Sequence, residues 1–461
     1  MLRSIKEILA EFLGESQVFE GSYSTVYGVL QAERSDGSEG LVLMAPFRVQ
    51  SGEPNICGIA FLLAFVSQFR KYSWWSRDLV ILIPGIEEIG SSRLAVERWL
   101  TEYHGFIPGK QNFSGVMQAG LSIELEGGLE KNCKAPFGDA RLYLEGPDGL
   151  LPNLDLVNTI LTIYHHRVSK LKITESKKNW FTPRPESHLD KVLHACSMLL
   201  RQAIDPGYAH GPLLRYRIDA VTLAMKSLEG HDDKTDESNC CIFEIVELTL
   251  RSLSNILEHL HQSFFFYIMT STEEFVSISK YIVIGILPIV AIMIRLVCFF
   301  FRGQLGGPLG KAVVFFAAVV TSVGISAAMI PRHIFGAIIG QLFCCFMLHM
   351  IFRISYQVAQ SLACFIGALS LCILLIFNFG LAVILGLFAG PLLCFALPKK
   401  FRYFYAILAG VLSSVPGLTS AWLTEKSLLW WNAGVPFVVL PSIFLLLAFA
   451  DSEPMKCTIR R

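Results

Sequence analysis

Length, composition and charge narrow the classes of protein to which this chain can belong. It has 461 residues, of which 53% are hydrophobic and only 17% charged, whereas ordinary soluble domains carry about 25% charged residues. The net charge of +1 is unevenly distributed along the chain. Residues 276–461 contain 13 basic and 3 acidic residues, whereas residues 1–275 contain the other 26 basic and 35 acidic residues. These values exclude a purely soluble protein, a disordered chain, a collagen and a small disulfide scaffold, and the acidic first part argues against nucleic-acid binding.

The first part of the chain predicts alternating strands and helices. Short apolar runs bounded by turn residues indicate strands at 27–32, 41–46, 79–83, 121–125 and 141–145. Helical periodicity is found at about 55–72, 91–104, 153–167, 188–204 and 240–268. The first two strands flank a turn-rich segment, so we predict that they form a β-hairpin. Polar segments at 169–187 and 226–238 are expected to be loops. The order predicts an α/β domain over residues 1–270, with a mixed sheet flanked by helices.

Two adjacent glutamates, Glu87 and Glu88, follow the apolar run 79–83. Open α/β sheets place active sites at the carboxyl ends of their strands, so Glu87 is a candidate general base and Glu88 a candidate metal ligand. The alternative is a solvated turn in which both glutamates are stabilised by a helix N-terminus.

The order of strand, glycine-rich turn, helix, strand and Glu-Glu-x-Gly resembles the di-zinc aminopeptidase family. Under this resemblance the later acidic ligand falls at Glu124 and the last histidine at His210, but the first histidine and the bridging aspartate fall at Pro46 and Pro54. Proline has no side-chain donor, so the bridged two-metal site of that family cannot form. One zinc ion could still be held by the three remaining candidates, Glu88, Glu124 and His210. A metal-free, peptidase-shaped scaffold is the alternative.

From residue 276 onward the chain predicts about seven membrane-spanning helices, in a domain over residues 271–461. Each apolar segment has about 20 residues, enough to cross roughly 30 Å of hydrocarbon. The segments are 276–300, 311–330, 333–352, 357–377, 379–397, 403–423 and 431–450. Because ionisable residues inside these segments are few, a transporter fits poorly.

Basic residues predict the orientation of these helices, because they concentrate on the cytosolic side. With the α/β domain in the lumen, only Lys280, Arg332 and Lys426 lie at luminal ends. We therefore expect a luminal α/β domain and a cytosolic C-terminus, and Asn112 in the sequon Asn-Phe-Ser is a candidate glycosylation site. Residues 1–13 predict a charged amphipathic helix rather than a signal peptide. We therefore expect either that a preceding membrane helix delivers the domain, or that the first downstream segment inserts and the domain is translocated after synthesis.

Three sequence blocks carry a closer resemblance. They are EGPDGLLPNLDLVN at 145–158, LRYRIDAVTL at 214–223 and LHQSFFFY at 260–267. They resemble signature blocks of the glycosylphosphatidylinositol (GPI) anchor attachment protein family, the large polytopic subunit of GPI transamidase, whose members begin with a membrane helix. The third block is also amphipathic, and the alternatives for it are the headgroup layer, a partner subunit or packing against the α/β domain.

The resemblance implies a complex of the endoplasmic reticulum that cleaves a C-terminal signal from a precursor protein and joins the new carboxyl end to the ethanolamine amine of a GPI lipid. The nucleophilic cysteine would belong to a separate caspase-like subunit. This chain would then be a non-catalytic subunit whose partners are the other transamidase subunits, the GPI lipid and precursor proteins. Candidate lipid-binding residues in the last span are Asn432, Pro436 and Pro441, because proline frees backbone carbonyls; kinks that aid packing are the alternative.

Two further functions remain open at this point. One is a membrane-tethered metallopeptidase that uses the residual zinc site. The other is an amine-activating subunit, in which Glu87 helps to deprotonate the ethanolamine ammonium before it attacks the acyl-enzyme.

Overall fold

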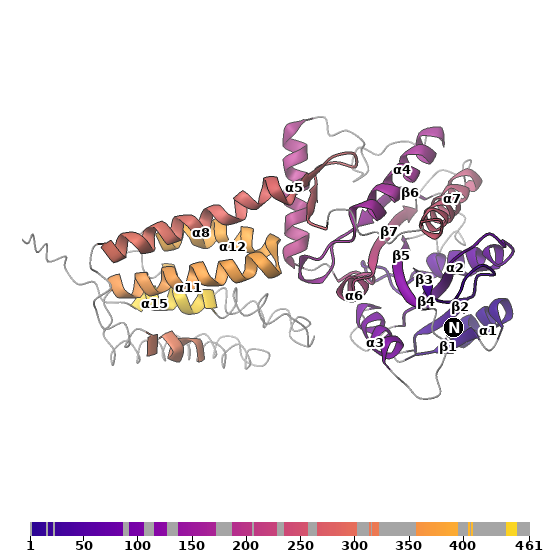
Figure 1. The fold of residues 1–461 in the computed structure, drawn as a ribbon, viewed down its shortest axis with the longest axis horizontal. Coiled ribbons are helices and arrows are strands. Elements are labelled where there is room, and N and C mark those ends of the chain that lie inside the picture. Colours follow the sequence, from indigo (N-terminus) through magenta and orange to yellow (C-terminus); the bar gives the residue numbers. More distant parts are fainter. Residues whose placement is uncertain are drawn as a thin grey trace, which may run out of the picture. The chain divides into compact units, whose positions relative to one another are not determined.

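The computed structural model of the chain divides into two compact units, residues 1–278 and 279–461 (Figure 1). The structure describes residues 2–14, 17–21, 24–85, 92–105, 115–126, 137–171, 187–204, 207–227, 235–256, 265–301, 313–314, 316–321, 356–394, 404–405, 407–408 and 439–449.

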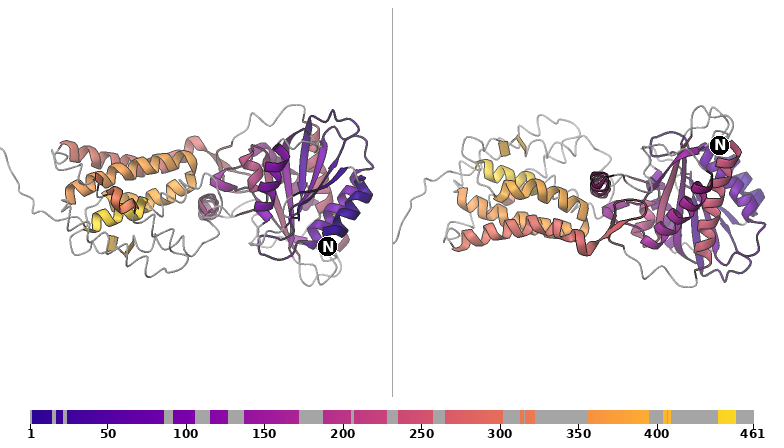
Figure 2. Two further views of the ribbon diagram at one scale, coloured as in Figure 1. Left: turned by 90° about the horizontal axis from the view of Figure 1, so that it is seen from below. Right: turned by 90° about the horizontal axis from the view of Figure 1, so that it is seen from above.

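The first unit is built on one seven-stranded mixed sheet (Figures 1 and 2). Its strands are β1 (Val18–Glu20), β2 (Val26–Leu30), β3 (Glu39–Met44), β4 (Asp78–Ile83), β5 (Val116–Glu126), β6 (Phe137–Tyr143) and β7 (Asp219–Ser227). Their order in space is β1-β2-β4-β3-β5-β7-β6. The four central strands, β4, β3, β5 and β7, run parallel, whereas β2 and β6 pair antiparallel at the two sides.

Helices cover both faces of this sheet. They are α1 (Leu2–Leu13), α2 (Ile56–Phe69), α3 (Ser92–His104), α4 (Leu154–Leu171), α5 (His188–Ile204), α6 (Gly211–Arg215) and α7 (Thr235–Ser254), with a 3-10 turn η3 (Pro147–Gly149). All six residues of β4 are buried, as expected for a parallel strand that is covered on both sides. The predicted α/β class is confirmed, and the helices predicted near 55–72, 91–104, 153–167 and 188–204 correspond to α2, α3, α4 and α5.

The predicted hairpin between 27–32 and 41–46 is wrong. β4 lies between the two strands, because Tyr27 of β2 pairs antiparallel with Leu82 and Val42 of β3 pairs parallel with Val80. The start of β4 also takes part in the turn that follows β2, since the Asp78 carboxylate accepts a hydrogen bond from the Ala32 amide at 3.0 Å. The hairpin was predicted only from the turn residues between the two strands. The order of the strands is instead set by the parallel crossover from β3 through α2 to β4.

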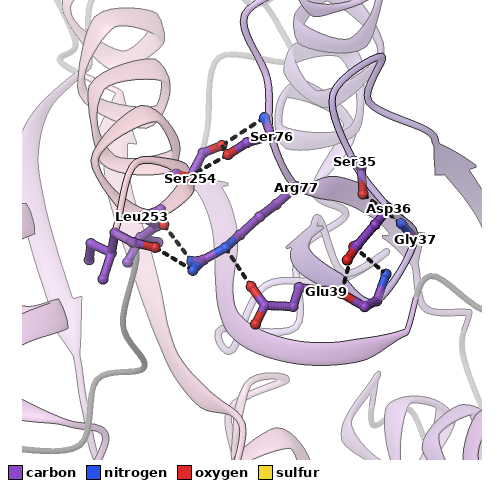
Figure 3. Close-up of polar contacts among 10 residues, drawn as sticks. Ser35, Asp36, Gly37, Glu39, Ser76, Arg77, Leu253 and Ser254 are labelled. Atoms are coloured by element: carbon purple, nitrogen blue, oxygen red, sulfur yellow. Dashed lines mark hydrogen bonds and ion pairs between the residues drawn. The ribbon is translucent and has the colours of Figure 1, made fainter.

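The predicted long helix at 240–268 is also wrong. α7 ends at Ser254, where Arg77 binds two carbonyls: Nη1 donates to Leu253 in the last turn of the helix, and Nη2 donates to Ile256 just after it, each at 2.5 Å (Figure 3). Ser76 adds a bond from its hydroxyl to the Ser254 carbonyl at 2.7 Å. A guanidinium at this end satisfies the free carbonyls and complements the helix dipole.

Two neighbouring boundaries differ from the prediction as well. Residues 226–227 belong to β7 and residues 235–238 to α7, so the predicted loop at 226–238 is shorter than expected, and α4 extends to Leu171. After α7 the chain forms a hairpin of β8 (Tyr267–Met269) and β9 (Phe275–Ser277). Tyr267 of the third sequence block is therefore in a strand, and residues 261–264 of that block lie outside the described residues.

The second unit contains apolar helices. They are α8 (Ile278–Phe301), which begins in the last residue of the first unit, α11 (Tyr356–Phe377), α12 (Phe379–Cys394) and α15 (Leu440–Phe449). Of the described helices, α8 and α11 are long and apolar enough to cross a membrane. The segments predicted at 276–300, 357–377 and 379–397 correspond to α8, α11 and α12. The span predicted at 333–352 lies outside the described residues, and those at 311–330, 403–423 and 431–450 are described only in part.

Small residues let α8 and α12 approach closely. Gly386 and Gly390 of α12 face Pro288 of α8, and a Cβ at Gly386 would lie 3.2 Å from the proline ring. This small-xxx-small spacing is typical of helix packing in membranes, where close backbone contact replaces the hydrophobic effect between helices.

Candidate functional site

The carboxyl ends of β3 and β5 are joined by the buried side chain of Asn55. Its Nδ2 donates to the Ile123 carbonyl at 2.9 Å, and its Oδ1 accepts from the amides of Leu125 at 3.0 Å and Gly58 at 3.1 Å. The last bond caps the N-terminus of α2. The site is so tight that a Cβ on Gly58 would lie 2.2 Å from Asn55 Oδ1. Asn55 thus fixes the loop that leads from β3 to α2 against the end of β5.

Glu124 projects from β5 beside this loop. Its side chain is only 3% exposed, and its Oε2 accepts a hydrogen bond from the Gln50 amide at 3.1 Å. Burial penalises the carboxylate and, with a smaller contribution from the charge of Glu126, raises the pKa of Glu124 to about 7. Near neutral pH this group can therefore hold or release a proton.

His210 lies on the same face of the sheet. It immediately precedes α6, is fully buried, and its Nδ1 is 2.7 Å from Thr222 Oγ1. Thr222 pairs with Ser122, and Ser122 shares a face of β5 with Glu124 because side chains alternate along a strand. Burial lowers the pKa of His210 to about 3, so the imidazole is neutral.

Tyr208 connects these groups to β6. Its ring stacks on Tyr143 with centroids 4.2 Å apart and lies 5.8 Å from the ring of His210. Burial raises the pKa of Tyr208, and the charges of Tyr143, Glu124 and Glu145 add to the effect. The arrangement is a buried polar layer that contains one carboxyl group, one neutral imidazole and one neutral phenol.

This layer supplies donors of the kinds that zinc prefers, a carboxylate oxygen and an imidazole nitrogen. Because Nδ1 of His210 is engaged with Thr222, a metal ion would have to bind Nε2. Within the described part of the chain, no group of three His, Cys, Asp or Glu residues is arranged to hold a metal ion. The third candidate ligand, Glu88, and the candidate base, Glu87, lie outside the described residues.

A second polar centre is the ion pair between Glu145 and Arg201. Glu145 is 2% exposed, and its Oε1 accepts from Arg201 Nη2 at 2.7 Å and Nε at 2.9 Å, while Oε2 accepts from the Leu144 amide at 3.3 Å. The pair borders a small, mainly apolar pocket that is also lined by Leu161, Met198 and Thr272. The Glu145 carboxylate is thus satisfied by the protein itself.

The first two sequence blocks that carried the family resemblance are in direct contact. A Cβ on Gly146 would lie 2.5 Å from Leu214 Cδ1, and the Asn153 amide donates to the Asp219 carboxylate at 2.8 Å. Burial raises the pKa of Asp219 to about 6.

The third block meets the first at Tyr267, whose hydroxyl donates to the Pro152 carbonyl at 3.0 Å. Segments separated by more than 100 residues therefore form one cluster.

Other predicted site residues are placed as follows. Pro46 and Pro54 both lie in the loop between β3 and α2, where Pro54 bridges to Arg48. Pro441 is buried in the first turn of α15. Asn112, Asn432 and Pro436 lie outside the described residues.

Sequence reasoning missed several residues of the site. Asn55 had a signal, because an Asn directly before a helical pattern is a typical N-cap. Gln50 binds through its backbone amide, and Arg201 finds Glu145 only through tertiary packing, so neither had a local signal.

Comparison with known families tests the resemblance of the three blocks. The family model described as "Gaa1-like, GPI transamidase component" matches residues 22–305, more than half of the chain. The chain belongs to this family. The match covers strands β2 to β7, the three blocks and α8, so the predicted resemblance is confirmed, whereas the likeness to aminopeptidases stays a prediction.

Two relatives show how far the similarity to this Gaa1-like chain extends. It is 33% identical over 256 residues to the GPI transamidase component gaa1 of Schizosaccharomyces pombe, covering 55% of this chain and 42% of the relative. It is 26% identical over 405 residues to the GPI transamidase component GAA1 of Saccharomyces cerevisiae, covering 83% of this chain and 62% of the relative. The chain thus spans between about two fifths and three fifths of the length of these relatives.

Proposed function

We propose that this chain is a non-catalytic subunit of a GPI transamidase, which assembles the complex and presents the GPI lipid for attachment to protein C-termini. The observation that carries the proposal is the family match over residues 22–305. The convergence of the three blocks into one cluster, through Gly146, Asn153 and Tyr267, supports it. Its partners are then the other transamidase subunits, including a caspase-like subunit that supplies the cysteine nucleophile, together with precursor proteins that carry GPI signals.

The proposed location is the endoplasmic reticulum membrane, with several spans, the α/β unit in the lumen and the C-terminus in the cytosol. The apolar helices α8 and α11 support membrane insertion. Cys57 on α2 is disulfide-bonded, and disulfides persist in oxidising compartments such as this lumen.

The non-catalytic role rests on the chemistry of the β3–α2 loop. The two positions at which an aminopeptidase would need metal ligands are Pro46 and Pro54. The Glu124 carboxylate already accepts a hydrogen bond from Gln50. The imidazole of His210 is paired with Thr222. These contacts suit a scaffold that retains the shape of a peptidase.

The alternative is a residual single-zinc site that makes the chain a metallopeptidase or an amine-activating subunit. The observation in its favour is that Glu124 and His210 lie on one face of the sheet, with a carboxyl pKa near 7 in a buried setting. Such a zinc ion would supply Lewis acidity, and Glu87 would act as the base.

One experiment separates these proposals. The tagged full chain is purified from microsomes, and co-purifying proteins, labelled GPI lipid, zinc and the rate of anchor transfer are measured for the wild type and for Glu88→Ala and Glu124→Gln. A scaffold recovers the transamidase subunits and lipid in all three forms, without stoichiometric zinc. About one zinc per chain that is lost in both variants, with slower anchor transfer in intact complexes, would establish the alternative. Failure to recover any transamidase subunit would refute both.

A further inference from the structure

α5 exposes apolar side chains on the side that faces away from the rest of the first unit. Five residues at helical spacing form this surface, which we call the α5 stripe: Leu189, Val192, Leu193, Cys196 and Leu200. All five are exposed, Leu189 to 66% and Leu193 to 57%. Positions i, i+3, i+4, i+7 and i+11 share one side of a helix. Because the other side of α5 is turned toward the unit through Met198, the helix has two apolar sides and only one of them is used internally.

α5 is fixed beside the segment that enters the first apolar helix. The Met269 amide of β8 donates to Met198 Sδ at 3.1 Å, and Lys191 Nζ forms an ion pair with Glu274 Oε2 at 2.5 Å. Figure 1 shows α5 next to the β8–β9 hairpin, away from the main sheet. β9 leads without a break into Ile278, the first residue of α8.

Chain geometry sets the depth of α5 relative to a membrane. The 24 residues of α8 extend for about 36 Å at 1.5 Å per residue, only slightly more than the roughly 30 Å hydrocarbon layer. The start of α8 therefore lies at the edge of that layer. Glu274 precedes Ile278 by four residues, so its Cα lies within about 14 Å of this edge. Its partner Lys191, near the start of α5, is therefore within reach of the headgroup region.

The hairpin beside α5 also exposes aromatic rings. Phe266 is 61% and Phe265 41% exposed, directly before β8. Aromatic side chains are enriched where hydrocarbon meets headgroups. The exposed apolar groups of α5 and of the hairpin thus belong to the part of the first unit that is covalently nearest to the membrane.

We propose that the α5 stripe, together with Phe265 and Phe266, binds the boundary between headgroups and acyl chains of the membrane that α8 enters. A helix with an apolar face, polar flanks and a position at the interface is typical of monotopic membrane contact. A phospholipid surface is favoured over a protein partner because the exposed side chains are all apolar and the neighbouring hairpin leads directly into α8. The proposal requires that α8 crosses a membrane, but it does not depend on the transamidase role.

Photolabelling of the full chain in its native membranes tests the proposal. Microsomes are loaded with phosphatidylcholine that carries a diazirine in the acyl chain near the headgroup, irradiated, and the labelled peptides are mapped. We expect label on peptides containing the α5 stripe, with peptides of α8 as the internal positive control. The double variant Leu193→Asn/Leu200→Asn should lower labelling of α5 by about tenfold or more, since each leucine contributes about that factor to burial in lipid. The matched control Val116→Asn alters an exposed apolar residue at the start of β5 and should leave labelling unchanged.

Two results would overturn the proposal. One is label on α8 with none on α5, and the other is equal labelling of α5 in the wild type and the double variant. If α5 is instead protected and crosslinks to another subunit, the surface binds protein and not lipid. The substituted side chains are exposed, and the amount of α8 labelling reports whether each variant has inserted normally.

Discussion

Replacing Glu124 by glutamine should change how the stability of the first unit depends on pH. Glutamine keeps the shape of the protonated carboxyl group and an oxygen that can accept the Gln50 amide hydrogen bond. The pKa of Glu124 is about 7 in the folded chain and 4.5 for an ordinary glutamate. Between these values the folded state binds more protons than the unfolded state, so this carboxyl group makes stability fall as pH rises. The contribution is present below pH 4.5 and is lost by about pH 7.

The size of this effect on the free energy of unfolding follows from the same two pKa values. At about 1.36 kcal/mol per pKa unit, the difference between 4.5 and about 7 corresponds to about 3 kcal/mol. Because Glu124 is 3% exposed, solvent screening reduces this value little. The free-energy difference between Glu124→Gln and the wild type should therefore shift by about 3 kcal/mol in favour of the variant between pH 4 and pH 8.

The comparison with the variant isolates Glu124 from other titrating groups. His210 acts with the opposite sign, because its pKa is about 3 in the folded chain and 6.5 ordinarily, so its contribution is lost as pH falls from about 6.5 to 3. Asp219 has a pKa raised to about 6 and acts with the same sign as Glu124. Both remain in the variant, so their effects cancel in the difference.

Urea titration of the full chain in detergent measures this difference, followed by tryptophan fluorescence, to which the buried Trp75 and Trp99 of the first unit contribute. Ser122→Ala is the matched control, because Ser122 is buried on the same face of β5 and has no group that titrates in this range. Its effect on stability should be independent of pH. A constant difference between Glu124→Gln and the wild type from pH 4 to pH 8 would refute the reasoning, and a slope that disappears when zinc is added would favour the metal-site alternative.

Four other substitutions test the packing of the two units. Asn55→Ala should lower the free energy of unfolding by about 3–5 kcal/mol, because it removes a helix cap and leaves buried backbone groups unpaired; urea titration measures this loss. Arg77→Met should cost about 2–4 kcal/mol and increase amide hydrogen exchange at the end of α7, whose carbonyls it binds. Arg201→Met should cost about 3–5 kcal/mol, because it leaves a buried carboxylate without its cation. Gly386→Val should cost about 1–3 kcal/mol in the second unit, measured by thermal unfolding in detergent, because its methyl groups would collide with Pro288.

Contrary outcomes for three of these substitutions are judged against an exposed baseline. Val116→Ala, at an exposed position, provides the baseline and should change stability by less than about 0.5 kcal/mol. A cost below about 1 kcal/mol for Asn55→Ala or Arg201→Met would mean that these contacts are not maintained in solution. Unchanged amide hydrogen exchange in α7 after Arg77→Met would show that the guanidinium does not stabilise the end of that helix.

The sequence predicted those parts of the fold that depend on local pattern. The unbroken apolar run 79–83 identified β4, and the apolar periodicity at 55–72 identified α2, because both signals are contained in one short segment. The two errors have a shared cause. The neighbour of β3 is β4, which follows α2 in the chain, and the end of α7 is bound by Arg77; both contacts come from segments distant in sequence.

In the candidate site, too, the sequence indicated single residues but not the contacts between distant ones. Glu124 and His210 were predicted through the resemblance to aminopeptidases, and the structure places them on one face of the sheet, while their role as ligands stays a prediction. The pairing of Glu145 with Arg201 had no local signal, because it depends on how α5 packs after the fold has formed. Residue types and order therefore indicate candidate chemistry, whereas the pairing of charges requires the tertiary structure.

The three family blocks suggest where the function of the α/β unit resides. Their polar groups are used within the unit, since Asp219 accepts from Asn153 and Tyr267 donates to Pro152. Groups that are hydrogen-bonded within the unit in this way are less available to bind a substrate. The cluster of the three blocks is therefore better explained by a role in stabilising the α/β unit. Tyr267 opens the short hairpin that leads to Ile278 and α8. The cluster thus lies next to the segment that enters the apolar helix α8, and the proposed lipid contact is expected outside it, on α5 and the hairpin.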